Sequence, residues 1–261
     1  MLIARFTTDS DPKFAIVSGE GEDRKLEVID GDPLYMPVQP TGEVISLNDD
    51  AVRLLTPVIP RSKVVGVGRN YADHAAEHGA QVPAEPLLFL KPNTAVIGPD
   101  DPILLPAWTN HVEHEVELAV VIGKITRDVP EGDALKHVFG YTVANDVTAR
   151  DAQRNDGQWT RAKGFDSALP LGPFISVGTS PDSLELFARV NGEQKQAGNT
   201  DQLVFGVAEL VSYISSVFTL LPGDVILTGT PAGVSPIEHR DVVECEISGI
   251  GVLRNPVLRR N

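Results

Sequence analysis

The chain has 261 residues, of which 42% are hydrophobic and 22% charged, an ordinary composition for a globular protein with one large domain or a domain plus a small appendage. Its 36 acidic and 22 basic residues give a formal net charge of −14, which repels nucleic acid and anionic lipid, so we expect neither as a partner. No stretch approaches the roughly 18 apolar residues of a membrane span, and the N-terminus turns acidic early, so we expect a cytoplasmic location.

The first sixty residues contain short apolar or alternating runs separated by Gly, Pro and Asp, among them KFAIVSG (13–19) and KLEVI (25–29). This pattern is typical of small strands joined by tight turns. A proline-punctuated stretch, TPVIPRSK (56–63), follows. We therefore predict a small β-rich N-terminal domain over residues 1–60 and a second domain over residues 61–261.

In the second domain, a short helix is predicted between Asn70 and Gly79, because a capping residue precedes the segment and a glycine ends it. Helical periodicity recurs at 148–154 and at 207–221, where Pro222 and Gly223 follow. Most other segments read as strands: 116–123, 138–145, 172–178, 184–193, 224–230 and 241–248. Strands outnumber helices without regular alternation, so the predicted class is α+β with a large mixed sheet or roll.

Two glycine-rich segments fail as nucleotide sites. GVGRNY has Tyr71 where a dinucleotide fingerprint needs its third glycine, and TGTPAGV lacks the Gly-Lys-Ser/Thr ending of a phosphate loop.

The strongest local signal for chemistry is the acidic cluster of Glu113, Glu115 and Glu117, which runs directly into an apolar segment. Strand alternation would put the three carboxylates on one face. Their mutual repulsion would be relieved by a hard cation such as Mg²⁺, Mn²⁺ or Ca²⁺. The alternative is an edge strand with a solvated charged face.

Four further residues each have a chemical and a plain structural interpretation. Asp146 ends an apolar run, where it is either a metal ligand or a helix cap. His74 and Glu77 lie three apart on the predicted helix, where they form either a base with its orienting carboxylate or an ordinary surface pair. Lys163 is either a desolvated cation for a substrate carboxylate or a solvated lysine.

Taken together, residues 63–256 resemble the fumarylacetoacetate hydrolase family, with the nearest likeness to its short acylpyruvate hydrolase and oxaloacetate decarboxylase branch. Six segments in the same order carry the resemblance: VGRNYADHAAE, LFLKPNTAVIGP, EVELAVVIGK, GYTVANDVTARDAQ, WTRAKGFDS and LLPGDVILTGTPAGV. The resemblance implies a mixed β-sandwich roll with few short helices, and a homodimer.

The resemblance also implies a role for each site residue. The metal ligands would be Glu115, Glu117 and Asp146, holding Mg²⁺ or Mn²⁺. The catalytic residues would be His74, Glu77 and Lys163. The substrate-binding residues would be Arg69, Asn70, Arg150, Gln153 and Thr230.

The implied function is Mg²⁺-dependent cleavage of a C–C bond in a small anionic 2-keto (1,3-dicarbonyl) acid, by an acylpyruvate hydrolase or an oxaloacetate decarboxylase. One alternative is an isomerase or decarboxylase of 2-hydroxyhepta-2,4-diene-1,7-dioate in aromatic catabolism. A remote alternative is a non-catalytic module that binds a metal or senses a ligand. The presence of His74, Glu77 and Lys163 beside the ligands disfavours that module.

Overall fold

A computed structural model describes residues 1–9, 11–77 and 79–259. A twelve-stranded mixed sheet dominates the described chain, with the strand order β4-β3-β2-β1-β14-β12-β11-β17-β6-β7, while β5 pairs with β1 and β8 with β14. Its strands are β1 (Leu2–Thr7), β2 (Lys13–Ser18), β3 (Lys25–Ile29), β4 (Pro40–Ser46), β5 (Arg53–Leu55), β6 (Val64–Gly68), β7 (Leu87–Lys91), β8 (Val96–Ile97), β11 (Val116–Ile122), β12 (Val138–Asn145), β14 (Leu169–Ser176) and β17 (Val225–Leu227).

A second sheet of five strands has the order β16-β15-β18-β19-β9, and a two-stranded ladder joins β10 to β13. The bounds are β9 (Ile103–Leu105), β15 (Glu185–Val190), β16 (Glu193–Asn199), β18 (Val242–Ile247) and β19 (Gly251–Arg259), with β10 (Val112–Glu113) and β13 (Thr148–Ala149). Residues of both sheets share one core, so the sheets pack face to face as a roll.

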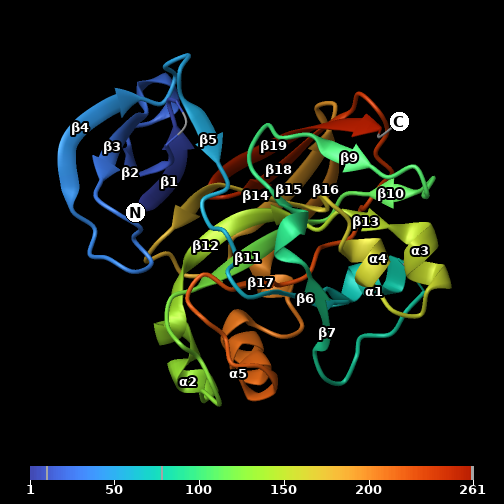
Figure 1. The fold of residues 1–261 in the computed structure, drawn as a ribbon. Coiled ribbons are helices and arrows are strands. Elements are labelled where there is room, and N and C mark those ends of the chain that lie inside the picture. The colour runs from blue at the N-terminus through green and yellow to red at the C-terminus, as the bar shows by residue number, and fades with distance from the viewer. Residues whose placement is uncertain (10, 78, 260–261) are drawn as a thin grey trace.

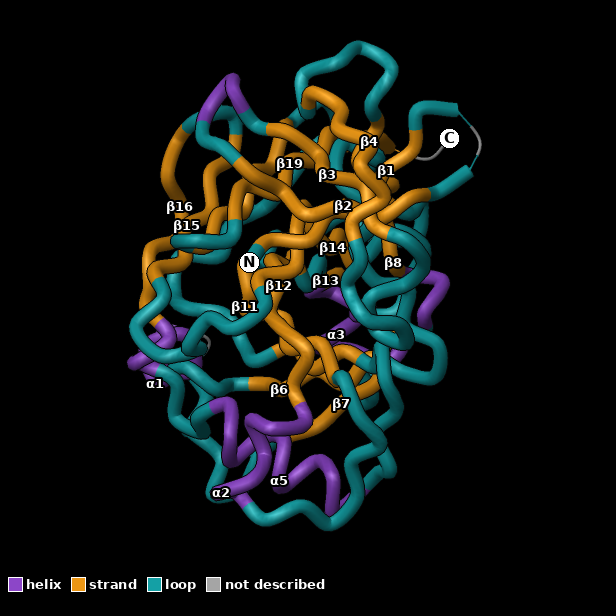
Figure 2. Tube along the Cα trace, turned by 90° about the vertical axis from the view of Figure 1, so that its left-hand side faces the viewer, coloured by secondary structure: helices purple, strands orange, loops and turns teal. Residues whose placement is uncertain are grey.

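The helices are few and short: α1 (Ala72–Glu77), α2 (Glu131–Ala134), α3 (Arg150–Asn155), α4 (Thr160–Lys163) and α5 (Val207–Val217). In Figure 1, α1, α3 and α4 gather at one side of the strands, whereas α2 and α5 lie together below them, as they also do in Figure 2. None of the helices described is long and apolar enough to cross a bilayer. The α+β class with mixed sheets and few short helices is confirmed.

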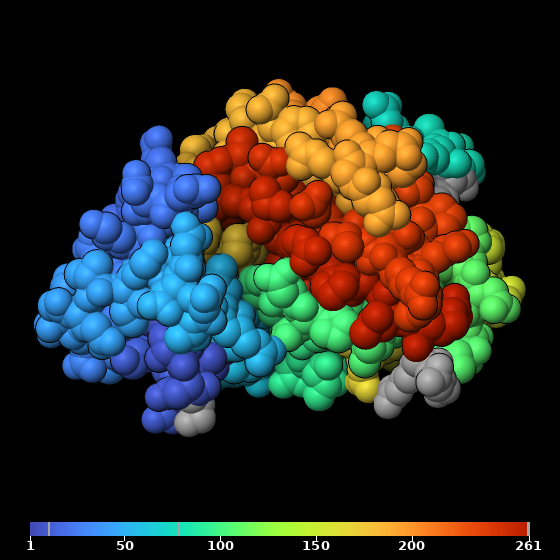
Figure 3. Space-filling model, turned by 90° about the horizontal axis from the view of Figure 1, so that it is seen from above, coloured from blue at the N-terminus to red at the C-terminus, as the bar shows by residue number. Residues whose placement is uncertain are grey.

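The N-terminal strands have a small core of their own. It contains Ala4, Phe6, Ala15, Val17, Leu26, Val28 and Phe174, the last contributed by β14. β1 pairs antiparallel with β14, so these strands also extend the large sheet. In Figure 3 they form a lobe beside the rest of the molecule. The domain boundary near residue 60 stays a prediction.

All three predicted helices are present, but the prediction of a helix over 207–221 was too long. Phe218 is extended, and Leu220 and Thr126 donate their backbone N–H groups to each other's carbonyl oxygens at 2.8 and 2.9 Å. Bridge formation by Leu220 therefore ends the helix at Val217, before Pro222. At the predicted helix 70–79, residues 72–77 are helical, and His78 lies outside the described residues.

Candidate active site

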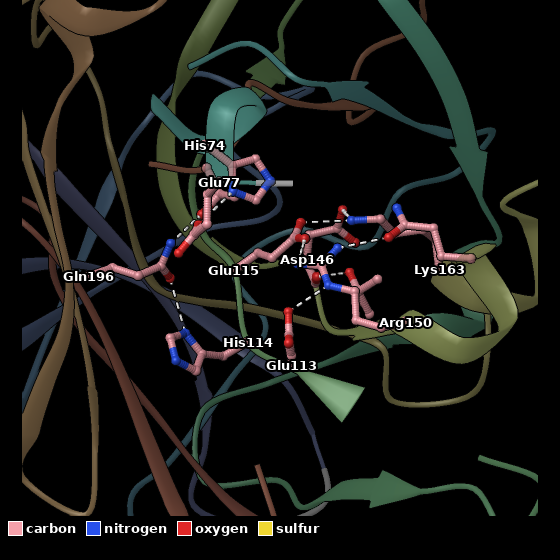
Figure 4. A network of polar contacts seen from close by, with 12 residues as sticks. His74, Glu77, Glu113, His114, Glu115, Asp146, Arg150, Lys163 and Gln196 are labelled. Atoms are coloured by element: carbon pink, nitrogen blue, oxygen red, sulfur yellow. Dashed lines mark hydrogen bonds and ion pairs between the residues drawn. The ribbon is translucent and has the colours of Figure 1, made fainter. Parts of the chain in front are cut away.

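A cavity of about 490 Å³ opens where the large sheet meets α1, α3 and α4. The end of β6, the residues that lead into β11, the loop after β12 and the loop after β17 also reach it. Its lining residues are Val67, Gly68, Arg69, His74, Ala75, Glu77, Phe89, Glu115, Glu117, Asp146, Arg150, Gln153, Arg154, Trp159, Lys163 and Thr230. Figure 4 shows its polar part from close by.

Three buried carboxylates meet in this cavity. Oxygens of Glu115, Glu117 and Asp146 lie within 4.8 Å of one another, and each residue is at most 3% exposed. β11 is a central strand between β12 and β17, so the interpretation of the acidic cluster as a solvated edge is wrong. The helix-cap interpretation of Asp146 is also wrong, because α3 begins at Arg150 and its N-cap is Ala149.

The expectation of one strand that carries Glu113, Glu115 and Glu117 on one face is met only in part, because the strand is interrupted. Glu113 belongs to β10, and the chain leaves strand geometry at residues 114–115 before β11 begins. The Glu113 carboxylate instead accepts from Arg150 Nε at 2.6 Å and lies 2.8 Å from His111 Nε2. Arg150 Nη2 also lies 2.6 Å from Glu115 Oε1, so the same guanidinium holds Glu113 beside the three converging carboxylates.

Three buried cations hold the carboxylates in place. Lys163 Nζ donates to Glu115 Oε2 at 2.7 Å and to Asp146 Oδ2 at 2.6 Å, so Lys163 is not a solvated surface lysine. Arg150 Nη2 lies 2.6 Å from Glu115 Oε1. Lys91, which the sequence analysis did not single out, donates to Asp146 Oδ1 and, at 2.9 Å, to the carbonyl oxygen of Ala168.

The charges in this cluster do not balance. Four carboxylates, counting Glu113, face the ammonium and guanidinium groups of Lys91, Arg150 and Lys163, so one negative charge would be uncompensated with all four ionised. Burial, followed by the nearby carboxylates of Asp146 and Glu115, raises the pKa of Glu117 well above its ordinary value. Burial would also raise the pKa of Glu115, but the charges of Lys163 and Arg150 outweigh it and lower that pKa.

This donor set fits a hard divalent cation. It offers three carboxylate ligands in a small volume, and Mg²⁺ and Mn²⁺ prefer oxygen ligands. A divalent ion would also neutralise the excess charge that disfavours ionisation of Glu117. Glu115, Glu117 and Asp146 are therefore the residues that could hold such an ion.

The predicted pair of His74 and Glu77 lies on the cavity wall, on α1. His74 Nδ1 is 3.5 Å from Glu77 Oε2, and both Glu77 oxygens accept from the backbone N–H of Gly233 at 3.2 Å. Glu77 is thus held between α1 and the loop after β17. His74 is 8% exposed, so its side chain is largely shielded from solvent although it lines the cavity.

The loop after β17 is fixed by residues that the sequence analysis did not connect with the site. Gly229, with a φ of +100° that favours glycine, donates its N–H to Glu117 Oε2 at 2.6 Å. Gln196, on β16, donates to Thr230 Oγ1 at 2.8 Å and to the carbonyl oxygen of Pro231 at 2.7 Å. Its own oxygen accepts from the N–H of Val116, which lies between Glu115 and Glu117, at 3.0 Å.

His114 completes this network, as Figure 4 shows. Burial lowers its pKa to about 4, so the ring is neutral. Gln196 Oε1 is an acceptor, and His114 Nδ1 is therefore the donor across 3.0 Å, which leaves Nε2 to accept from the hydroxyl of Ser235 at 2.9 Å. No sequence pattern around Gln196 or His114 predicts that these side chains support the loop after β17, so this role is visible only in the fold.

Four of the five predicted substrate-binding residues line the cavity: Arg69, Arg150, Gln153 and Thr230. Asn70 does not. It is fully buried, its amide donates to the carbonyl oxygens of Phe205 and Thr228, and its oxygen accepts from the N–H of Phe205. Its polar atoms are committed to the backbone, so the structure places Asn70 behind the cavity wall.

A roll of two sheets, with a cavity beside the large sheet that holds a buried carboxylate triad, defines an α+β protein with an acidic site that could hold a metal. The family model described as Fumarylacetoacetate (FAA) hydrolase C-terminal matches residues 63–258, and a second model, Rv2993c-like, N-terminal, matches residues 1–57. The chain belongs to the fumarylacetoacetate hydrolase family, whose members are enzymes.

Three similar proteins show the range of this family. The 2-hydroxyhepta-2,4-diene-1,7-dioate isomerase of Mycobacterium marinum has a crystal structure with a TM-score of 0.92 and 46% identity, which covers 100% of this chain and 99% of that one. The oxaloacetate tautomerase FAHD2A, mitochondrial, of Bos taurus is 46% identical over 85% of this chain and 72% of its own. The fumarylpyruvate hydrolase of Pseudomonas aeruginosa, solved with Mn²⁺ and pyruvate, has a TM-score of 0.73 and 37% identity, covering 82% of this chain and 94% of that one.

Proposed function

We propose that this enzyme transfers a proton between carbon and oxygen in a small 2-keto acid, as a keto–enol tautomerase or isomerase that depends on Mg²⁺ or Mn²⁺. The observation that carries the proposal is the placement of a nearly dry histidine on the wall of the cavity that holds the three buried carboxylates. Similarity to an isomerase along the full chain and to an oxaloacetate tautomerase supports this reaction class. An ion held by Glu115, Glu117 and Asp146 would supply Lewis-acid stabilisation of the enolate charge.

The residues of the chain have separate tasks in this proposal. Lys163 and Arg150 attract the anionic substrate and keep it at the inner end of the cavity, which is needed because the net charge of the whole chain repels it. His74 takes the proton from the carbon next to the keto group and delivers it to the enolate oxygen, and the reverse step returns it to carbon. Glu77 stabilises the imidazolium that forms, and the N–H of Gly233 keeps Glu77 in position.

A second candidate is cleavage of a C–C bond, by hydrolysis of an acylpyruvate or decarboxylation of oxaloacetate. Similarity to the fumarylpyruvate hydrolase supports it. For hydrolysis, His74 would take a proton from water instead of from carbon. Decarboxylation needs no water nucleophile, so the cations of the inner cavity would suffice for that step.

The experiment is a comparison of proton exchange with bond cleavage on one substrate, oxaloacetate, with Mn²⁺-loaded enzyme. Nuclear magnetic resonance in D₂O follows deuterium uptake at the carbon next to the keto group, and a coupled assay follows pyruvate release. We expect exchange to be much faster than release, and His74→Ala to slow exchange by roughly 10²–10⁴, the range for loss of a general base. Pyruvate release that keeps pace with exchange would favour the second candidate, and exchange unaffected by His74→Ala would exclude His74 as the base.

We also propose that the enzyme forms a homodimer and acts in the cytoplasm, as the sequence analysis predicts. Sedimentation velocity of the purified chain tests the dimer, and a single boundary at the monomer mass would contradict it.

A further inference from the structure

Two arginines at the cavity lack the carboxylate partners that the inner cations have. Arg69 and Arg154 line the cavity and are exposed, whereas Arg150 and Lys163 are buried in ion pairs. Among the residues that the structure describes, no carboxylate oxygen lies within 4.0 Å of either guanidinium. Their charge is therefore available to a ligand.

The backbone directs both arginines to the same space. Arg154 follows Arg150 by four residues on α3, so both project from one face of the helix, roughly one turn or 6 Å apart along its axis. Arg69 directly follows β6 and has a φ of +59°, a left-handed conformation that costs a non-glycine residue about 1–2 kcal/mol. A glycine would avoid this cost but would bring no charge to the cavity, and such strain often marks a functional site.

Large apolar side chains continue the cavity wall from Lys163 towards the segment that carries Arg69, since Lys163 Nζ lies 5.2 Å from the centre of the Phe89 ring. Phe89 and Trp159 line it in an edge-to-face arrangement with ring centroids 5.5 Å apart. Trp159 also closes tightly over Gly68, where an added Cβ would lie 2.6 Å from the indole ring. This wall suits the carbon chain of a substrate whose anionic head lies at the carboxylate cluster, and Arg69 and Arg154 add two cationic groups to the same cavity.

We propose that Arg69 and Arg154 bind the distal carboxylate of the substrate, so that the enzyme selects 2-keto dicarboxylic acids over 2-keto acids with an uncharged end. The inference rests on the proposed function, because the keto-acid head must lie at the carboxylate cluster for the other end to reach the arginines. Guanidinium groups bind carboxylates with two parallel charge-assisted hydrogen bonds. They also offset the repulsion that the net charge of −14 exerts on a dianion.

The test uses two acids of equal chain length, 2-oxoglutarate and 2-oxopentanoate, which differ only in a distal carboxylate or methyl group. Titration calorimetry measures their dissociation constants, and that of oxalate, on Mn²⁺-loaded enzyme. Hydrogen bonds to charged groups are strong enough for about a tenfold effect or more, so we expect 2-oxoglutarate to bind at least about tenfold tighter than 2-oxopentanoate. Arg69→Gln and Arg154→Gln should each reduce this preference, and the double variant should abolish it.

Controls separate the two proposals. Binding of 2-oxopentanoate and oxalate should stay within about twofold in all variants, because 2-oxopentanoate has no distal carboxylate and oxalate is too short to extend beyond the keto-acid head. Arg69→Gly accepts the left-handed backbone and should behave like Arg69→Gln, and Arg127→Gln, at an exposed site before α2, should change nothing. An unchanged preference in the double variant, or equal loss for both acids, overturns the distal site. Failure of oxalate and both acids to bind wild-type enzyme overturns the proposed function together with it.

Discussion

Replacement of Lys91 by methionine should cost the protein much of its stability, because it keeps the volume of the side chain but removes a buried charge. Lys91 is 2% exposed, and its ammonium group donates to Asp146 and to the carbonyl oxygen of Ala168. Removal of one partner of a buried ion pair typically costs about 3–5 kcal/mol. At roughly 2–4 °C per kcal/mol for a chain of this size, the melting temperature should fall by roughly 6–20 °C.

The assay is urea and thermal unfolding of Lys91→Met in the presence of a chelator, beside Lys136→Met. Lys136 forms an exposed pair with Asp133 at 2.5 Å, which should contribute less than about 1 kcal/mol. Excess Mn²⁺ should raise the melting temperature of Lys91→Met more than that of the wild type, because a competing positive charge beside Asp146 is gone. If Lys91→Met unfolds like Lys136→Met, the charge balance that we derive for the cluster is wrong.

Three further changes test the site and its support. Glu117→Gln and Asp146→Asn should each abolish Mn²⁺ binding in calorimetry, and chelation should abolish turnover of the wild type; full turnover after exhaustive chelation would contradict this. The pKa of His114 is about 4 in the folded chain against 6.5 in the unfolded one, so the unfolded chain binds more protons between these pH values. The unfolding free energy therefore carries the full contribution of His114 above pH 6.5 and loses roughly 3 kcal/mol between pH 6.5 and pH 4. His114→Gln should flatten this part of the curve of unfolding free energy against pH. An unchanged slope would refute the assignment to His114. Gln196→Leu should lower kcat/KM by about tenfold or more, because Thr230 and the N–H of Val116 lose a buried hydrogen-bond partner. Gln196→Glu should keep part of the activity, because its side chain retains the acceptor for Val116. An equal loss in both variants would leave Gln196 with a packing role only.

The sequence predicted strands and site residues correctly where the hydrophobic periodicity and the residue types of one segment agree. The alternating and apolar runs predicted the strands 116–123 and 138–145 within a residue or so, because these strands lie in the middle of the large sheet. The run of three glutamates suggested an oxygen-rich site, but the residues alone could not say that the chain breaks between Glu113 and Glu115. Only the family resemblance selected the pair that faces Asp146.

What the sequence could not give depends on contacts between distant segments. Lys91 and Asp146 are 55 residues apart, and nothing in LFLKPN marks its lysine as buried. Gln196 of β16 and Thr230, in the loop after β17, are in contact although they are 34 residues apart. The segment 218–221 is apolar enough to continue a helix, yet its bridge to Thr126 prevails, because a long-range pairing overrides local propensity.

The pairing of β1 with β14 affects the tendency of the protein to aggregate with other molecules. The described residues of the segment 1–60 contribute nothing to the lining of the cavity, so chemistry does not require them there. β1 nevertheless covers one side of β14 through the pairs of Leu2, Ile3 and Ala4, and Phe174 of β14 lies in the small N-terminal core. Without these strands, β14 would present unpaired backbone groups and an exposed aromatic ring, a template for strand addition by another chain. The N-terminal strands therefore protect β14 from aggregation. A shortened enzyme would need charged residues or a proline along the edge of β14 to stay soluble.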